Sequence, residues 1–298
     1  MKIPDFFIVG AAKAGTTSLF DYLTQHPAIF VPHMKEPHYF SDFEHRYAPK
    51  LANDEEYLRL FAACRDDQLA GDLSTSYLYS VNAPRRIRQL QPNARIMMVL
   101  RNPIERAYSF YWYNRNQFVE PLGFEEALEA EPERIAAGEN FRFHYVESGR
   151  YCPQVERYLE VFGEEAVRIY LFEDLVRDAT GLCRDILAFL GLSTDLELVT
   201  CDVFNRSGEF RSNALGHLLN ARFPGKELIR RLAPGKARRL RANLMKLNIR
   251  RPPPMRPETR EMLVERFRDD VERLSVLLQR DLSSWLALPQ VAVARAEA

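Results

Sequence analysis

A short apolar run followed by a loop of small residues constrains the fold of this chain more than any other feature. Phe6 to Val9 is an unbroken apolar run, typical of a strand buried on both faces of a parallel sheet. The loop from Gly10 to Gly15 follows it, and residues 16–23 have the pattern of a helix. Backbone N–H groups at the start of such a helix bind anions. The sequence therefore predicts a phosphate-type anion site here.

Similar units recur along the chain and set the fold class. Apolar runs at residues 96–100 and 167–172 predict two more buried strands. A helix is expected from the Asn102-Pro103 pair through Asn116, and another over residues 180–190. Alternating strands and helices indicate an α/β fold, here a P-loop-containing central parallel sheet flanked by helices.

The C-terminal part reads as a helical extension of a single domain that spans residues 1–298. Within residues 257–286 we expect a helix whose end is anchored by Trp285, and residues 287–298 are expected to form a flexible tail. Apolar residues recur there every three or four positions: Leu263, Phe267, Val271, Leu274 and Leu278.

The charge distribution excludes some classes of protein. Forty-one Lys and Arg residues balance 41 Asp and Glu residues, which excludes a globally basic nucleic-acid binder. Residues 222–256 nevertheless carry twelve Lys or Arg against the single acid Glu227. This stretch is interpreted as a solvated helical cap, a docking surface for an acidic or lipid-bearing acceptor with peripheral membrane contact, or an oligomer contact. Residues 120–139, with seven Glu and one Arg, are expected to form a solvated helix face.

Cysteine spacing and apolar runs bear on cofactors and location. Cys64, Cys152, Cys183 and Cys201 form no C-x-x-C pair, so neither a zinc site nor a disulfide framework is indicated, and buried cysteines are expected. No apolar run reaches the ~20 residues that span a bilayer, and the first residues lack a signal-peptide pattern. The expected location is the cytoplasm.

The loop differs from the nucleoside-triphosphate loop G-x-x-x-x-G-K-[ST] in one informative position. Gly10, Gly15 and Thr17 fit that pattern, but Thr16 stands at the lysine position and the cation is Lys13, inside the loop. This arrangement favours a different phosphorylated ligand.

Arg101 strengthens that interpretation. It follows the second strand, where an ATPase carries an acid for Mg²⁺. A phosphorylated ligand held without metal is therefore expected. Two alternatives stay open: a P-loop small-molecule or nucleotide kinase, and a nucleotide-binding module without catalysis.

At these residues the chain resembles the sulfotransferases that use 3′-phosphoadenosine 5′-phosphosulfate (PAPS). Residues 6–17 are similar to their 5′-phosphosulfate loop, and residues 100–109 to their 3′-phosphate motif. Residues 171–175 and 280–285 recur in many bacterial members. The closer resemblance is to the carbohydrate or heparan-type domain. It implies transfer of a sulfuryl group to a hydroxyl, less often an amine, without metal and with adenosine 3′,5′-bisphosphate as product.

The resemblance also assigns roles to residues. Lys13 would contact the 5′-phosphate and its bridging oxygen, and Arg101 and Ser109 the 3′-phosphate. The remaining loop residues would cradle the 5′-phosphate: Ala14, Gly15, Thr16, Thr17 and Ser18.

The general base is expected in residues 35–40, which resemble the segment that carries the catalytic Glu in carbohydrate-type members. Glu36 is the first candidate, and His38 either orients the acceptor or acts as the base itself. Asp72 is a third candidate. Leu73 follows it where carbohydrate members often have Lys, so a sulfated polysaccharide acceptor is less expected.

Other positions carry weaker signals. Tyr151 is expected either near adenine or in the core. Arg206 and Arg211 are cations of a loop that resembles the one closing over the 3′-phosphate. The dense aromatic series at residues 108–113 is expected to divide between the core and the acceptor pocket. A small molecule, a glycan and a lipid all remain open as hydroxyl acceptors, and so does the oligomeric state.

Overall fold

The computed structural model describes residues 2–43, 51–195, 199, 208–212 and 247–288. The strands are β1 (Phe6–Gly10), β2 (Ile29–Phe30), β3 (Leu69–Asp72), β4 (Arg95–Leu100), β5 (Val167–Leu171), β6 (Glu209–Phe210) and β7 (Ile249–Arg250). The helices are α1 (Thr16–Leu23), α2 (Asp54–Arg59), α3 (Ala83–Leu90), α4 (Pro103–Asn116), α5 (Phe124–Glu129), α6 (Glu131–Ala136), α7 (Cys152–Phe162), α8 (Phe172–Arg177), α9 (Ala179–Phe189) and α13 (Pro257–Leu278). Short 3₁₀ turns include η1 (Phe141–Phe143) and η4 (Ser283–Leu286).

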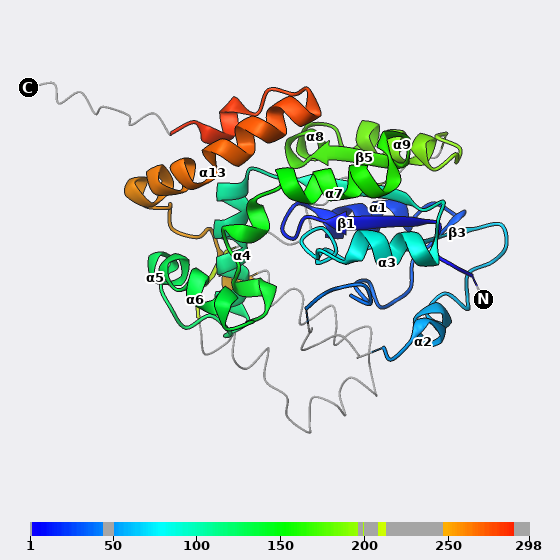
Figure 1. Cartoon of the computed structure of the whole chain (residues 1–298), viewed down its shortest axis with the longest axis horizontal. Coiled ribbons are helices and arrows are strands. Elements are labelled where there is room, and N and C mark those ends of the chain that lie inside the picture. Colours follow the sequence, from blue (N-terminus) through cyan, green and yellow to red (C-terminus); the bar gives the residue numbers. More distant parts are fainter. Residues whose placement is uncertain (1, 44–50, 196–198, 200–207, 213–246, 289–298) are drawn as a thin grey trace, which may run out of the picture.

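The core is a parallel sheet, as the sequence predicts. Its order is β2-β3-β1-β4-β5, and every neighbouring pair is parallel. All five residues of β1 are buried, in agreement with a strand covered on both faces. Helices α3 and α7 pack against each other, as do α1 and α9, and Figure 1 shows helices in front of and behind the sheet. The α/β fold with helices flanking a central sheet is confirmed.

Four strands were not expected from the sequence because they are short: β2 and β3 of the central sheet, and the two-residue strands β6 and β7. β2 has two residues and β3 has four, too few to show a periodic pattern. Gly71 in β3 lies against β1 so closely that a Cβ there would be 2.2 Å from the ring of Phe6. Glycine is therefore required at position 71 for β3 to pack against Phe6 of β1.

The topology puts two loops side by side. From β1 the chain turns toward β2 through α1, whereas from β3 it returns past β1 to β4 on the other side. In open α/β sheets, ligands bind outside the carboxyl ends of the strands at such a change of direction. The loop after β1 and Arg101 after β4 meet at this point.

The predicted helices form with small changes in their bounds. Asn102 caps α4, as predicted, by accepting hydrogen bonds from the backbone N–H groups of Ile104 and Glu105. α9 begins and ends one residue earlier than expected. The C-terminal helix is shorter than the expected 257–286, because it ends at Leu278 in the left-handed residue Gln279.

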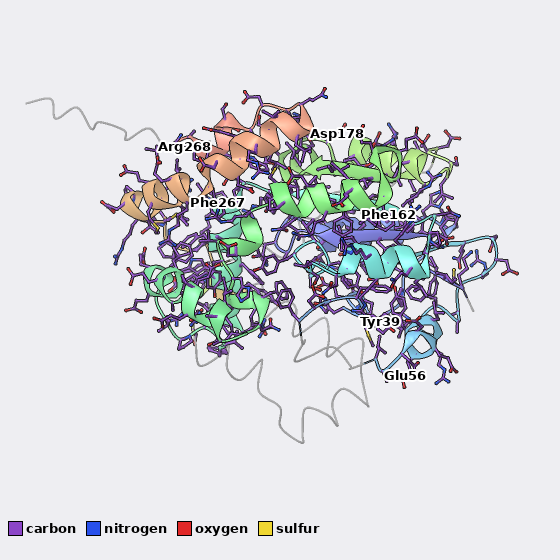
Figure 2. The ribbon with its side chains drawn as sticks, in the orientation of Figure 1. Tyr39, Glu56, Phe162, Asp178, Phe267 and Arg268 are labelled. Carbon is purple, nitrogen blue, oxygen red and sulfur yellow. The ribbon has the colours of Figure 1, made fainter. Side chains whose placement is uncertain are left out.

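The C-terminal helix α13 is amphipathic, as its sequence pattern indicates. Phe267 faces the body of the protein and is fully buried, whereas its neighbour Arg268 lies on the outer side (Figure 2). Beyond the helix, Trp285 is buried and its indole N–H donates to Glu173 at 3.1 Å. The predicted anchoring by Trp285 is confirmed.

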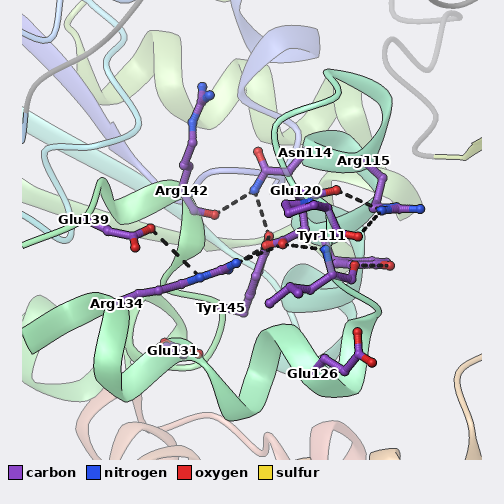
Figure 3. Close-up of polar contacts among 12 residues, drawn as sticks. Tyr111, Asn114, Arg115, Glu120, Glu126, Glu131, Arg134, Glu139, Arg142 and Tyr145 are labelled. Atoms are coloured by element: carbon purple, nitrogen blue, oxygen red, sulfur yellow. Dashed lines mark hydrogen bonds and ion pairs between the residues drawn. The ribbon is translucent and has the colours of Figure 1, made fainter. Parts of the chain in front are cut away.

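The prediction that residues 120–139 form a solvated face is wrong at two positions. Glu120 and Glu131 are each only 2% exposed. Glu120 accepts hydrogen bonds from Arg134 and from the hydroxyl of Tyr145 (Figure 3). Burial alone would raise the pKa of Glu120, but these bonds hold it below its usual range. Local sequence patterns do not reveal this network, because its partners lie up to 25 residues apart.

Candidate active site

The loop between β1 and α1 has the backbone of an anion-binding site. Lys13 and Gly15 both adopt left-handed conformations, with φ of 72° and 86°. A non-glycine residue in this region is strained, and such strain clusters at functional sites. Gly15 is also needed for packing, because a Cβ there would lie 2.7 Å from Leu175 of α8. The N–H groups at the start of the eight-residue helix α1 are thereby held in place.

The side chain of Lys13 lies in a buried, positively charged environment. Burial and the nearby guanidinium of Arg101 lower the pKa of Lys13 to about 8, against the opposing effect of Glu36. Its Nζ lies 4.5 Å from the centre of the Tyr113 ring. A bound anion would offset both the cost of burying the charged Lys13 side chain and its repulsion from Arg101. This position therefore favours a phosphate or sulfate group.

Arg101 links the loop after β1 with the loop after β4. Its Nη1 donates to the backbone oxygen of Lys13 at 3.0 Å, and its guanidinium lies 4.8 Å from the centre of the Phe172 ring. Ser109, on α4, lines the same cavity as Arg101. Two cations and a hydroxyl predicted from separate motifs are thus brought together.

Only some of the other predicted nucleotide contacts line the cavity. Arg211 lines the cavity, but Arg206 lies outside the described residues. Tyr151 is fully buried and is not among the residues that line the cavity, so of its two predicted positions the structure has the core one. Arg250 and Arg251, from the basic stretch, also line the cavity. Most of that stretch, residues 222–246, lies outside the described residues.

Glu36 and His38 lie together in the cavity. The Nε2 of His38 is 3.3 Å from Glu36 Oε2, and its Nδ1 is 2.8 Å from the hydroxyl of Ser76. Burial and the nearby Lys35 lower the pKa of His38 to about 4. A neutral His38 at pH 7 can donate one N–H to Glu36 and accept from Ser76, which suits orientation of the carboxylate better than proton removal.

Lys35 is a site residue to which the sequence analysis assigned no role. Its Nζ donates to the hydroxyl of Thr17 at 2.7 Å and lies 3.5 Å from Glu36 Oε1. The hydroxyl of Thr75 donates to the other oxygen of Glu36 at 3.1 Å. Lys35 therefore connects the phosphate loop with the carboxylate. Its position next to Glu36 was the available signal, but only the fold places it against Thr17.

Asp72 does not join the other candidate bases. It is completely buried and accepts hydrogen bonds from Ser74, Tyr57 and Tyr77 at 2.6, 2.8 and 2.9 Å. Burial raises its pKa to about 6. Ser74 in turn accepts from the backbone N–H of His38 at 3.2 Å. Asp72 thus supports the segment that carries Glu36 and does not line the cavity.

Residues of the phosphate loop, Glu36, His38 and Arg101 line one cavity of about 2070 Å³. This volume exceeds the ~300–1,000 Å³ of a usual ligand pocket, so a nucleotide and a second molecule fit together. Its lining includes Lys13, Thr16, Thr17, Ser18, Glu36, His38, Arg101, Ser109 and Arg211. In the aromatic series on α4, Tyr111 is buried outside the cavity lining and Phe110 is nearly buried but lines the cavity. Tyr108, Trp112 and Tyr113 also line it.

Two features are absent from the described residues. These residues contain no group of three or more His, Cys, Asp or Glu side chains arranged to hold a metal ion. Within the same residues, none of the helices has the length and apolar character needed to cross a membrane. Cys152 and Cys183 are buried as expected and Cys64 is half-buried, all as free thiols, whereas Cys201 lies outside the described part of the chain.

Known sulfotransferases resemble this chain in sequence, and one of them also resembles it in structure. The chain is 34% identical to a sulfotransferase from Alicyclobacillus acidocaldarius of known crystal structure, with a TM-score of 0.75, covering 96% of this chain and 100% of that one. It is 26% identical, over 95% of its length, to the mouse bifunctional heparan sulfate N-deacetylase/N-sulfotransferase 4, and spans 31% of that protein. Human heparan sulfate glucosamine 3-O-sulfotransferase 6 is 29% identical over 64% of this chain and 53% of that protein.

A model of a whole protein family also matches this chain. The family model described as the sulfotransferase domain matches residues 3–213, which include the phosphate loop, Glu36, Arg101 and Ser109. A kinase is not favoured by these relatives. The chain spans about a third of the length of the first curated relatives it matches. By this match and by its likeness to the Alicyclobacillus enzyme, the chain belongs to the sulfotransferase family.

Proposed function

We propose that this chain transfers a sulfuryl group from PAPS to the hydroxyl of an acceptor, with Glu36 as general base. The observation that carries the proposal is that one cavity contains Lys13, Arg101 and Glu36. Anion-binding groups and a carboxylate that line one cavity suit transfer of a charged group to a hydroxyl.

Each residue has a defined part in the proposed reaction. Glu36 accepts the acceptor's hydroxyl proton as the acceptor oxygen bonds to sulfur and the bond from sulfur to the 5′-phosphate oxygen breaks. Lys13 neutralises charge on that departing oxygen, and Arg101 with Ser109 holds the 3′-phosphate. Adenosine 3′,5′-bisphosphate and a sulfated acceptor are the products. These side chains supply the charges that the reaction needs, and no step uses a metal.

Calorimetric titration tests the nucleotide site directly. In EDTA, adenosine 3′,5′-bisphosphate should bind with micromolar affinity and ATP only weakly. Transfer of label from PAPS to an acceptor would then be measured in the same buffer. Failure to bind the bisphosphate, with ATP binding restored by Mg²⁺, would overturn the proposal in favour of a kinase.

The pKa of Lys13 predicts a pH dependence of nucleotide affinity. Because this pKa is lowered to about 8, Lys13 is mainly protonated at pH 7 and loses its charge above pH 8. Bound phosphates favour the charged form, so the dissociation constant should be flat from pH 7 to 8. Above pH 8 it should increase by up to about tenfold per pH unit. Calorimetry from pH 6.5 to 9.5 measures this, and Lys13→Arg should remove the rise; an identical rise in that variant would assign it to another group.

Lys35 should support catalysis through Glu36 and Thr17. Lys35→Met removes the donor to Thr17 and the cation beside Glu36, while keeping a long apolar side chain. We expect a decrease in kcat of about tenfold, the lower end of the range for losing one charged hydrogen bond. Steady-state assays with labelled PAPS separate kcat from KM. Lys35→Arg retains the charge and should recover most of the activity, and equal kcat in Lys35→Met and the unsubstituted chain would contradict the role.

A further inference from the structure

The helix that borders the phosphate loop is too short to be stable by itself. α8 has six residues, and Leu175 is the one that is buried. Isolated helices of this length are unstable in water, so contacts with other segments must hold α8. A Cβ at Gly15 would lie 2.7 Å from Leu175 and 3.1 Å from Phe172, which places α8 directly against the phosphate loop. The position of α8 therefore affects the shape of that loop.

Phe172, the first residue of α8, also contacts Arg101. The guanidinium of Arg101 lies 4.8 Å from the centre of the Phe172 ring and donates to the backbone oxygen of Lys13 at 3.0 Å. All three residues line the cavity. The attraction between a cation and a ring depends on the ring being held over or under the charge. The direction of the guanidinium is thus set by the phosphate loop and by α8.

The C-terminal segment, residues 279–286, holds α8 from outside the cavity. Arg280 donates through Nη1 to one carboxylate oxygen of Asp174 at 2.6 Å and through Nη2 to the other at 3.3 Å. The indole N–H of Trp285 donates to Glu173 at 3.1 Å. Figure 1 shows the end of α13, from which this segment continues, next to α8. The described residues 279–286 do not line the cavity themselves.

The same tryptophan is bound to the loop that carries Arg101. The Nδ2 of Asn102, the residue that follows Arg101, donates to the backbone oxygen of Trp285 at 3.1 Å. Trp285 is buried, and its ring lies 6.3 Å from that of the buried Tyr151. Trp285 therefore has a fixed position in the core. It connects the end of β4, which carries Arg101, with α8, which carries Phe172.

The helix before this segment is held to the body by other contacts. α13 packs through its buried apolar face, and its Asp270 accepts hydrogen bonds from the backbone N–H groups of Tyr151 and Cys152 at 2.7 and 3.1 Å. Removing the indole N–H of Trp285 leaves all these contacts in place. The bond from Trp285 to Glu173 therefore acts on α8 and not on the docking of α13.

We propose that Trp285 is a positioning residue of the nucleotide site, which acts through Asn102 and Glu173 to keep the guanidinium of Arg101 directed at the 3′-phosphate. This inference rests on the proposed function, in which Arg101 holds that phosphate. It assigns a role to a part of the chain beyond residue 213, where the family match ends. A nucleotide binds tightly only to molecules in which Arg101 is in place, so the apparent dissociation constant increases as their fraction falls.

Calorimetric titration of the full chain in EDTA tests this role. Trp285→Phe keeps a buried ring but removes the N–H that donates to Glu173. We expect the dissociation constant of adenosine 3′,5′-bisphosphate to increase about tenfold, the lower end of the range for losing a hydrogen bond to a charged group. Adenosine 5′-monophosphate lacks the 3′-phosphate, so its affinity should stay nearly unchanged. An equal loss for both nucleotides would contradict a role through Arg101.

Two arginines that bind one carboxylate provide a matched pair of surface variants. Arg280 and Arg177 each lie 2.6 Å from an oxygen of Asp174, but Arg177 belongs to α8 itself. Arg280→Gln should increase the dissociation constant of the bisphosphate about threefold, the size of a partly exposed ion pair, whereas Arg177→Gln should leave it unchanged. Arg280→Lys keeps the charge and should recover most of the affinity. Equal affinities in Arg280→Gln and Arg177→Gln would contradict the hold on α8.

Val271→Ala is the control for a general loss of stability. Val271 is buried on α13 and makes no part of the link to α8. Its truncation should lower the melting temperature measured by circular dichroism, because it leaves a small cavity in the core. The affinities for both nucleotides should not change. A loss of bisphosphate affinity equal to that of Trp285→Phe would assign the effect to stability and overturn the inference.

The outcomes separate this inference from the proposed function. If the unsubstituted chain binds the bisphosphate and Trp285→Phe binds it equally tightly, the function stands and the inference is overturned. If the unsubstituted chain does not bind the bisphosphate, the proposed function itself fails, and the inference fails with it.

Discussion

Glu36→Gln should lower the turnover number by about 10²–10⁴-fold, the usual contribution of a general base. Glutamine has the same shape as glutamate and can still accept a hydrogen bond from Thr75, but it cannot take up the acceptor's proton. Affinity for adenosine 3′,5′-bisphosphate should stay near normal, because Glu36 is not among the groups that bind the nucleotide. Single-turnover assays with labelled PAPS and calorimetry measure the two quantities.

Asp42→Asn is the matched control for this substitution. Asp42 is a second carboxylate that lines the same cavity, but its oxygens are engaged by Asn82. Its replacement should leave the turnover number within about tenfold of normal, well short of the loss of a general base. Full activity in Glu36→Gln would contradict the assignment and move the base to His38, since Asp72 is enclosed by three donors.

Lys13→Ala and Arg101→Ala should each weaken binding of adenosine 3′,5′-bisphosphate by about 10- to 150-fold, the range for one charged hydrogen bond. Lys13→Ala should also lower the turnover number, because the departing oxygen loses its neutralising charge. Arg101→Ala should act mainly on affinity, with a smaller effect on turnover. Calorimetry and steady-state kinetics with PAPS separate the two effects.

Lys2→Ala provides the control for Lys13 and Arg101. Lys2 is a lysine outside the cavity, with a weak ion pair to Asp5 at 3.7 Å, and its removal should leave affinity unchanged. If both Lys13→Ala and Arg101→Ala bind the bisphosphate normally, the nucleotide site lies elsewhere. If only Arg101→Ala does so, the 3′-phosphate contact passes to Arg211, Arg250 or Arg251.

Local pattern was sufficient for the strand, loop and helix that begin the chain. The apolar run of β1, the start of α1 and the cap at Asn102 each depend on neighbours within a few residues, so their physics is visible in the sequence. Lys13 and Arg101 were found in the same way, from their places in these units, whereas Glu36 was found from family resemblance. The bounds of α4 were correct for the same reason.

Long-range packing decided which charged side chains are buried and which segments meet, and local sequence patterns do not show this. Glu120 and Glu131 looked like solvent-facing acids, yet they are buried because Arg134, Tyr145 and backbone N–H groups supply hydrogen bonds. Lys35 gains its contact with Thr17 only because the two segments fold onto one cavity. Such pairings follow from the whole fold, not from spacing along the chain.

The sequence by itself determined the parallel α/β architecture, the phosphate loop and the residues that meet at it, since these follow from short-range periodicity and from the rule that strand ends share one edge of a sheet. Only the tertiary structure decided that Asp72 is enclosed, that Tyr151 belongs to the core and that His38 is neutral. Only it brought the rings of residues 43, 110, 113 and 141 to the lining of one cavity. Burial and desolvation act through space, so these properties exist only once distant segments have packed together.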